Sequence, residues 1–192
     1  AACRRARNAT AFSELLQAKT QLTLEVLSES DEAALTFSGA LIGLPVLDAP
    51  TLVIDIGGGS TEYTVGTQSI DVFASIPFGA VTSTESHISS DLPRPEDLTN
   101  LIGAVSDELE DITRDHPIVA TAIRTVGVAG TIVAIAAVEL GLHEFDDAAL
   151  HGMTLSREAV EDVFRTVATE PLALRVQNPG LGPDRADIIV AG

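Results

Sequence analysis

Three consecutive glycines in TLVIDIGGGSTEYTV, residues 51–65, constrain the fold of this chain more than any other feature of its sequence. They separate two runs that are rich in β-branched residues, and each run predicts a β-strand. Because the connection is so short, the two strands are expected to form an antiparallel hairpin. A short hairpin turn rarely needs three glycines, so the triplet predicts that a ligand approaches the main chain, with a ligand-free turn as the alternative.

Other glycine-rich loops that bind phosphate or carry a nucleophile do not match this pattern. A P-loop has Lys after its last glycine and opens a helix, whereas Ser60 follows the triplet here. A Rossmann fingerprint and a nucleophile elbow both require glycine at the position of Glu62. The remaining interpretation is a hairpin turn whose successive backbone N–H groups bind an anion.

Carboxylates flank the triplet on both sides, with Asp55 ending the first predicted strand and Glu62 near the start of the second. They would repel a bound phosphate unless a divalent cation lay between them. Mg²⁺ accepts one or two carboxylates together with phosphate oxygens and keeps several waters. The residues therefore predict a site for Mg²⁺ and phosphate, in which Asp55 and Glu62 hold the metal.

The overall charge narrows the choice of partners. The chain has 11 Lys and Arg residues and 28 Asp and Glu residues, which gives a net charge of −17. This charge argues against nucleic acids and anionic membrane surfaces as partners. No apolar run approaches the ~20 residues that span a bilayer, no signal-peptide pattern is present, and Cys3 is the single cysteine. We therefore expect a cytoplasmic protein.

Strand and helix patterns alternate along the chain and predict an α/β fold. Helices are expected over residues 5–18, 28–45, 95–114, 131–141 and 156–167, and a last one begins at residue 184. Strands are expected over residues 21–27, 51–56, 60–65, 69–78 and 123–130. Ser30 is the expected N-cap of the second helix. Because the last helix has no room to finish, we expect the chain to be a piece of a larger protein.

Five segments carry a resemblance to one family. DIGGGSTE, residues 55–62, resembles the second phosphate loop of the exopolyphosphatase / guanosine pentaphosphate phosphohydrolase (Ppx/GppA) family. Four more segments resemble that family's motifs in the same order, namely CRRARNATAF (3–12), LSESDEAALTFSG (27–39), VGVAGT (126–131) and PGLGPDRADIIVAG (179–192). The chain departs from the family pattern at Glu29, where Gly is usual, at Asp31, where Glu is usual, and at Ala34, where Arg is common.

The resemblance implies a fold and a division of the chain. The fold is the actin-like ATPase fold of sugar kinases, actin and chaperones, which is ribonuclease H-like, with a mixed sheet and flanking helices. Residues 1–27 would be the end of a first lobe and the hinge. Residues 28–192 would be the second lobe, truncated at its C-terminus. Substrate would bind between the two lobes, so the chain alone is expected to be nearly inactive. The face that would meet the missing lobe is expected to be apolar, which would favour self-association, for example as a homodimer.

The resemblance also implies roles for individual residues. Glu32 matches the family's catalytic glutamate, which takes the proton from the attacking water. The implied phosphate-binding residues are Arg4 on the first helix, Gly57, Gly58, Gly59 and Ser60 at the first loop, and Gly130 and Thr131 at a second loop. For the second loop, a close helix–strand turn without a ligand is the alternative. Arg4 would clamp a phosphate, with a solvated helix position as the alternative. Asp184, Arg185 and Asp187 are interpreted as a capping and salt-bridge set.

The function implied by this resemblance is Mg²⁺-dependent hydrolysis of phosphoanhydride bonds. The substrate would be inorganic polyphosphate, from which terminal orthophosphate is released. Guanosine pentaphosphate, which would connect the protein to the stringent response, is the alternative substrate. A sensor that binds polyphosphate or a nucleotide without turnover is the alternative of a different class. The presence of Glu32 favours the enzyme.

Overall fold

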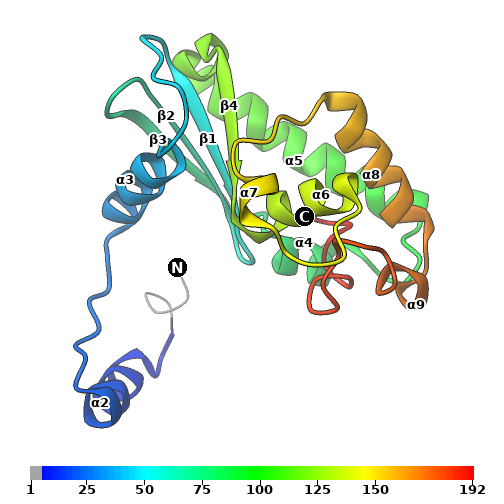
Figure 1. Cartoon of the computed structure of the whole chain (residues 1–192), viewed down its shortest axis with the longest axis horizontal. Coiled ribbons are helices and arrows are strands. Elements are labelled where there is room, and N and C mark those ends of the chain that lie inside the picture. The colour runs from blue at the N-terminus through cyan, green and yellow to red at the C-terminus, as the bar shows by residue number, and fades with distance from the viewer. Residues whose placement is uncertain (1–5) are drawn as a thin grey trace.

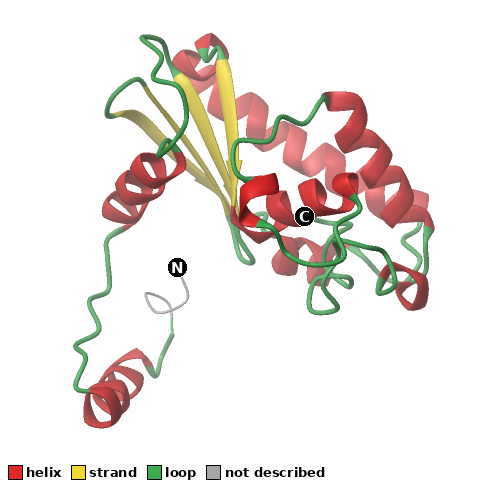
Figure 2. Ribbon diagram, in the orientation of Figure 1, coloured by secondary structure: helices red, strands yellow, loops and turns green. Residues whose placement is uncertain are grey.

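The computed structural model describes residues 6–192 and is built around one mixed sheet. Its strands are β1 (Thr51–Ile56), β2 (Thr61–Gly66), β3 (Ile70–Ile76) and β4 (Arg124–Val128), in the order β3-β2-β1-β4. Strands β1, β2 and β3 pair antiparallel, and β4 joins β1 in parallel (Figure 2). The glycine triplet lies in the connection between β1 and β2, so the predicted hairpin is confirmed.

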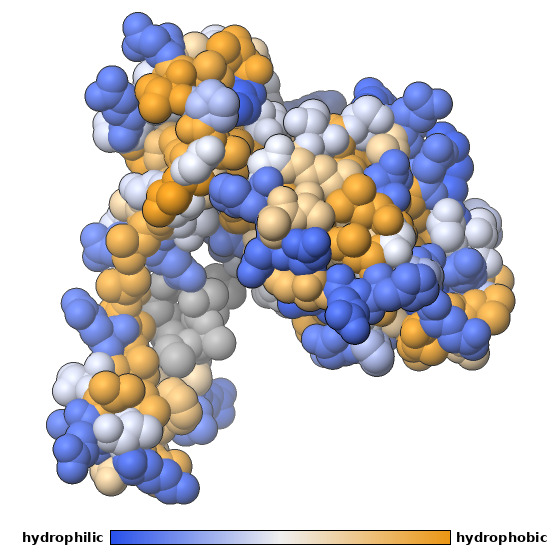
Figure 3. All heavy atoms as spheres, viewed as in Figure 1, coloured by the Kyte–Doolittle hydropathy of each residue, from blue (hydrophilic) through white to orange (hydrophobic). Residues whose placement is uncertain are grey.

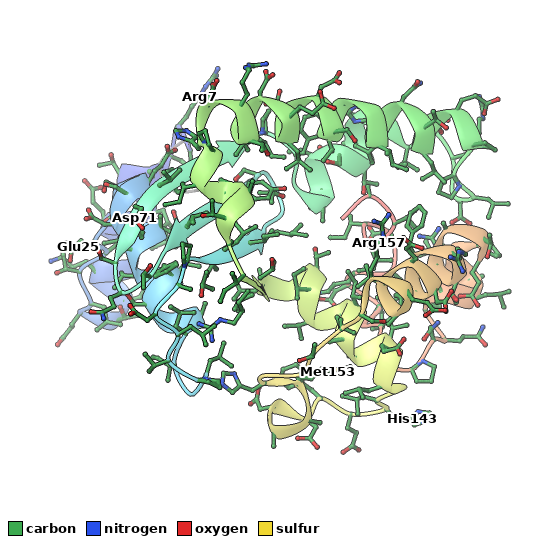
Figure 4. The ribbon with its side chains drawn as sticks, turned by 90° about the horizontal axis from the view of Figure 1, so that it is seen from above. Arg7, Glu25, Asp71, His143, Met153 and Arg157 are labelled. Atoms are coloured by element: carbon green, nitrogen blue, oxygen red, sulfur yellow. The ribbon has the colours of Figure 1, made fainter. Side chains whose placement is uncertain are left out.

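Helices cover both faces of this sheet. Helix α3 (Glu29–Ala40) contacts all four strands. Helix α5 (Pro95–Asp115) and the 3₁₀ turn η1 (Pro117–Thr121) cover the other face, where Ile112 packs with Tyr63 and Ile76. Figure 4, seen from above, shows α5 running along its side of the sheet. Because side chains alternate along a strand, Leu52 and Ile54 face α5 while Val53 and Asp55 face α3.

A second apolar core lies beside the open edge of β4. It joins α6 (Ala129–Leu140), α8 (Arg157–Thr169) and the C-terminal segment. Its buried members are Ala134, Val163, Val167, Ala168, Leu181, Ala186, Ile189 and Val190. The short helices α7 (Asp147–Leu150) and α9 (Leu172–Arg175) connect these elements (Figure 1).

The buried side chain of Arg175 makes hydrogen bonds to segments that are distant in the sequence. The guanidinium of Arg175 donates to the carbonyls of Glu170, Ala186 and Asp91 at 2.6–2.9 Å. It also pairs with the Asp91 carboxylate at 2.9 Å, and only 3% of its side chain is exposed. A buried charge is tolerated when it is paired and hydrogen-bonded in this way.

Helix α2 (Ala9–Thr20) stands apart from the sheet and has no buried residue. Residues 21–28 join it to α3 without regular secondary structure. The strand expected over residues 21–27 is therefore wrong, because no other strand of the described chain lies beside these residues to pair with them. Apolar side chains along α2 and this connection are exposed, among them Phe12, Leu15 and Leu22 (Figure 3).

Several helix boundaries also differ from expectation. Helix α3 is capped by Ser28, not Ser30, because the Ser28 hydroxyl accepts from the amide of Asp31 at 3.1 Å. Residues 184–192 form successive turns and not a regular helix. Helix α4 (Ala80–His87) was not expected. No helix within residues 6–192 has both the length and the apolar composition needed to span a membrane.

Candidate functional site

A pocket between α3 and the sheet brings together residues that are far apart in the sequence. Its walls are Glu29, Glu32, Ala33 and Thr36 from α3, and Val53, Asp55, Glu62, Thr64 and Phe73 from the strands. The expected base Glu32 and the expected metal residues Asp55 and Glu62 therefore share one cavity. Glu32 is exposed and lies in the first turn of α3, where the helix dipole favours a negative charge.

The hairpin register places the two strand carboxylates together. Asp55 and Glu62 are direct cross-strand partners in the pairing of β1 with β2. Partners in such a pair project from the same face of a sheet, about 5 Å apart at Cβ. Like charges at this separation oppose each other, so the pair favours a bound cation.

The electrostatics of the pocket are consistent with this arrangement. Burial raises the pKa of Asp55, and the nearby charges of Glu62 and Glu32 raise it further. Glu62 Oε1 accepts hydrogen bonds from the hydroxyls of Ser60, at 2.5 Å, and Ser75, at 3.3 Å. Two serine hydroxyls thus orient the Glu62 carboxylate, whereas ionisation of Asp55 is opposed by the negative charges of Glu62 and Glu32.

The carboxylates of Asp55 and Glu62 fit a Mg²⁺ ion that has further ligands from outside the protein. Within residues 6–192 there is no group of three His, Cys, Asp or Glu side chains that is able to hold a metal ion by itself. Mg²⁺ is usually bound by one or two carboxylates, substrate phosphates and waters, and not by an all-protein cage. Asp55 and Glu62 match that requirement, so the residues fit a cation that arrives with a phosphate ligand.

The glycine turn offers fewer donors than the sequence suggested. The amide of Gly57 donates to the carbonyl of Ser60 at 3.0 Å, and the Ser60 hydroxyl donates to Glu62. The amides of Gly58, Gly59 and Ser60 have no acceptor within the described part of the chain. These three successive N–H groups are the ones that remain for an anion.

The second glycine loop lies beside the first. Val128 is the partner of Asp55 in the parallel pairing of β4 with β1, so Gly130 and Thr131 follow next to the glycine turn. Thr131 is buried, with 3% exposure. Ala129, the first residue of α6, has a φ of 69°, which is unfavourable for a residue with a Cβ.

The guanidinium of Arg185 packs directly against Gly130 and leaves no space there for a side chain. Arg185 has no ion-pair partner among residues 6–192, so its interpretation as part of a salt-bridge set is not supported. It lines a groove that runs from Gly130 along the C-terminal segment to His143 and Phe145. Arg4, the other expected phosphate-binding arginine, lies outside the described residues.

Sequence reasoning missed the residues that contact the carbonyl side of the glycine turn. The first turn of α4 donates hydrogen bonds to the turn, and Gly79 packs against it. The only sequence signal was the isolated glycine in IPFGAVT, residues 76–82, which indicates a close backbone approach.

Comparison with known proteins identifies relatives for the whole chain. The model of the Ppx/GppA phosphatase family matches residues 1–192. The chain is 33% identical over 171 residues to exopolyphosphatase 2 of Mycobacterium tuberculosis, which covers 88% of this chain and 52% of that protein. It is 31% identical over 136 residues to the guanosine-5'-triphosphate,3'-diphosphate pyrophosphatase of Pseudoalteromonas atlantica, which covers 70% of this chain and 27% of that protein. The match thus spans about half the length of the first of these relatives and about a quarter of the length of the second.

Solved structures show the same fold. An exopolyphosphatase-like protein matches 100% of this chain and 62% of its own, with a TM-score of 0.88 and 29% identity. The Ppx/GppA protein of Aquifex aeolicus matches 100% of this chain and 61% of its own, with a TM-score of 0.85 and 29% identity. The expected actin-like α/β lobe, with a mixed sheet and flanking helices, is therefore confirmed.

Proposed function

Because the chain belongs to the Ppx/GppA phosphatase family, we propose that it forms the catalytic half of a Mg²⁺-dependent phosphoanhydride hydrolase. The preferred substrate is inorganic polyphosphate, from which the enzyme releases terminal orthophosphate. The observation that carries this proposal is the single pocket that gathers Glu32, Asp55 and Glu62 beside the glycine turn. Phosphoryl transfer needs positioning and charge stabilisation, and these are the groups that provide them.

Glu32 acts as the general base in this proposal. Its carboxylate takes a proton from the water that attacks the terminal phosphorus, while the bond to the bridging oxygen breaks. The amides of Gly58, Gly59 and Ser60 bind the phosphoryl oxygens as their negative charge increases. Within residues 6–192, the pocket that contains Glu32 has neither Cys nor His in its lining, which favours direct attack by water.

Asp55 and Glu62 would hold Mg²⁺ next to the phosphate. The ion would neutralise charge on the phosphoryl oxygens and so allow a polyanion to enter an acidic pocket. The crowded carboxylates support this role, since burial and the charges of Glu62 and Glu32 raise the pKa of Asp55. The net charge of −17 makes a cation still more necessary for binding of a polyanionic substrate.

Guanosine pentaphosphate is the second candidate substrate. The similarity to the Pseudoalteromonas atlantica relative, which is named for hydrolysis of a guanosine polyphosphate, supports it. The relative with the broader coverage of this chain is named an exopolyphosphatase, and we therefore place polyphosphate first. Both substrates end in a phosphoanhydride, so the same residues would act on either.

The test measures orthophosphate release by the full-length protein from polyphosphate and, separately, from guanosine pentaphosphate. Each reaction is run with Mg²⁺ and with excess chelator. We expect faster release from polyphosphate and loss of release with chelator. Release from guanosine pentaphosphate alone would assign the second substrate, and tight binding of both without release would assign a sensor.

A further inference from the structure

The first turn of α4 binds the glycine turn along one side. The amides of Ala80 and Val81 donate to the carbonyls of Gly57 and Gly58 at 2.9 Å each. The amide of Thr82 donates to the same Gly58 carbonyl at 3.1 Å. The Thr82 hydroxyl lies 3.2 Å from the carbonyl of Gly59, with the carbonyl of Gly79 at 3.3 Å as the alternative acceptor of its proton. All three glycine carbonyls therefore lie within hydrogen-bonding distance of a donor on α4.

These contacts determine where the amides of the turn point. In a planar trans peptide, the carbonyl of one residue and the N–H of the next point in opposite directions. The described chain contains no cis peptide bond. Since the carbonyls of Gly57, Gly58 and Gly59 are directed toward α4, the N–H groups of Gly58, Gly59 and Ser60 are directed away from it. These are the same three amides that have no acceptor within residues 6–192.

Gly79 allows α4 to come this close. A Cβ at Gly79 would lie 2.5 Å from the carbonyl carbon of Gly58 and 2.5 Å from the amide nitrogen of Ser60. Both are backbone atoms, so the turn or the helix would have to move. The amide of Gly79 donates to the Thr82 hydroxyl at 3.0 Å, which holds that hydroxyl beside the turn. The Thr61 hydroxyl donates to the carbonyl of Phe78 at 2.6 Å and fixes the preceding residue.

We propose that the first turn of α4 is a clamp that orients the phosphate-binding amides, and that Gly79 and Thr82 are positioning residues for the hydrolysis. This inference rests on the proposed function of the glycine turn. The helix N-terminus does not bind the anion itself, because its first amides are used by the glycine carbonyls. It acts by preorganising three donors, which is the condition under which backbone amides stabilise developing charge.

The test compares Thr82→Val with Thr82→Ser and with the matched control Thr84→Val. The hydroxyl of Thr84 lies in the same helix and donates to the carbonyl of Ala80 at 2.7 Å, without contact to the turn. Hydrolysis of inorganic tripolyphosphate with Mg²⁺, equilibrium binding of tripolyphosphate, and Tm are measured in the full-length protein. Gly79→Ala is measured as well, and its Cβ is expected to displace the backbone of the turn and to lower Tm.

Thr82→Val should lower kcat/KM by about 10- to 100-fold, because misdirected donors lose part of the stabilisation that such amides supply. Thr82→Ser should stay within about 3-fold of wild type, since it keeps the hydroxyl. Thr84→Val should match Thr82→Val in Tm but keep its activity. Equal activity of Thr82→Val and Thr84→Val at equal Tm would overturn the clamp. If the wild type binds tripolyphosphate without hydrolysing it, the proposed function fails. The tripolyphosphate dissociation constants of Thr82→Val and Thr84→Val, compared with each other, would still test the clamp.

Discussion

Glu32 shares its pocket with a second α3 carboxylate, Glu29, and this provides a matched pair of variants. Glu32→Gln removes the proposed proton acceptor but keeps the size of the side chain. We expect kcat to fall by about 10²- to 10⁴-fold with little change in polyphosphate binding, because the loss falls on the chemical step. Glu29→Gln removes the same charge from the same pocket and should change kcat by less than about 5-fold. Similar kcat values for the two variants would mean that Glu32 is not the base.

We expect Asp55 to lower the stability of the folded protein when no cation is present. Its pKa is raised from 3.8 by burial and by Glu62 and Glu32, so the folded state binds more protons than the unfolded state just above pH 3.8. Stability therefore falls as pH rises from 3.8 through the folded pKa, and the full cost remains above that value. The cost is reduced by solvent, since the carboxylate is only partly buried.

In the presence of chelator at pH 7, we expect Asp55→Asn to raise Tm by about 2 °C. Near pH 3.8 we expect the substitution to leave Tm unchanged. Mg²⁺ at millimolar concentration should raise the Tm of wild type and not of Asp55→Asn, because the ion binds the folded state. Asp71→Asn, an exposed carboxylate of β3, is the control and should show neither effect. A Mg²⁺-dependent rise in Tm that survives Asp55→Asn would remove Asp55 from the metal site.

Helix α3 carries Glu32 in its first turn, so its N-cap links local stability to activity. The hydroxyl of Ser28 accepts from the amide of Asp31 at 3.1 Å. Ser156 caps α8 in the same way, accepting from the amide of Ala159 at 3.1 Å, at a distance from the site. Each Ser→Ala change should cost about 1 kcal/mol of unfolding free energy.

Only Ser28→Ala should also lower kcat, by about 3- to 10-fold, because fraying of the first turn of α3 misplaces the base. Denaturant unfolding and steady-state kinetics of Ser28→Ala and Ser156→Ala make the comparison. An equal fall of kcat in the two variants would show a global effect and would contradict the role of the α3 cap.

Helix α4 shows why an element that contacts the proposed site escaped prediction. Residues 80–87, AVTSTESH, are rich in Ser and Thr and have no continuous apolar stripe. The helix forms because its first amides find carbonyls in the glycine turn, more than 20 residues earlier in the chain. The strand expected over residues 21–27 failed for the opposite reason, since its alternating pattern has no partner in the described chain. The periodicity of a sequence reveals neither a distant hydrogen-bond partner nor the lack of a partner strand.

Several residues of the proposed site are exposed, and this determines what the chain should do alone. Glu32, Gly58 and Gly59 are all exposed to solvent. Contacts to phosphate are weak in water because the effective dielectric constant is high. We expect the 192-residue chain to release phosphate from polyphosphate at less than about 1% of the rate of the full-length protein, because under the proposed two-lobe arrangement the other lobe would supply the donors that fix the substrate. Circular dichroism should show that the isolated chain is folded, and comparable specific activity of the two proteins would contradict the expectation.

The sequence by itself determined the β1–β2 hairpin and placed Asp55 and Glu62 on either side of its turn, while the register that pairs them came from the structure. The hairpin is a local feature, because a short connection allows two neighbouring strands to pair only antiparallel. The long helix α5 was equally predictable, because its apolar stripe repeats at helical spacing. Tertiary structure alone decided that Glu32 would face this pair and that α4 would hold the glycine carbonyls. Those contacts join distant segments, and they depend on how whole elements pack and not on any local pattern.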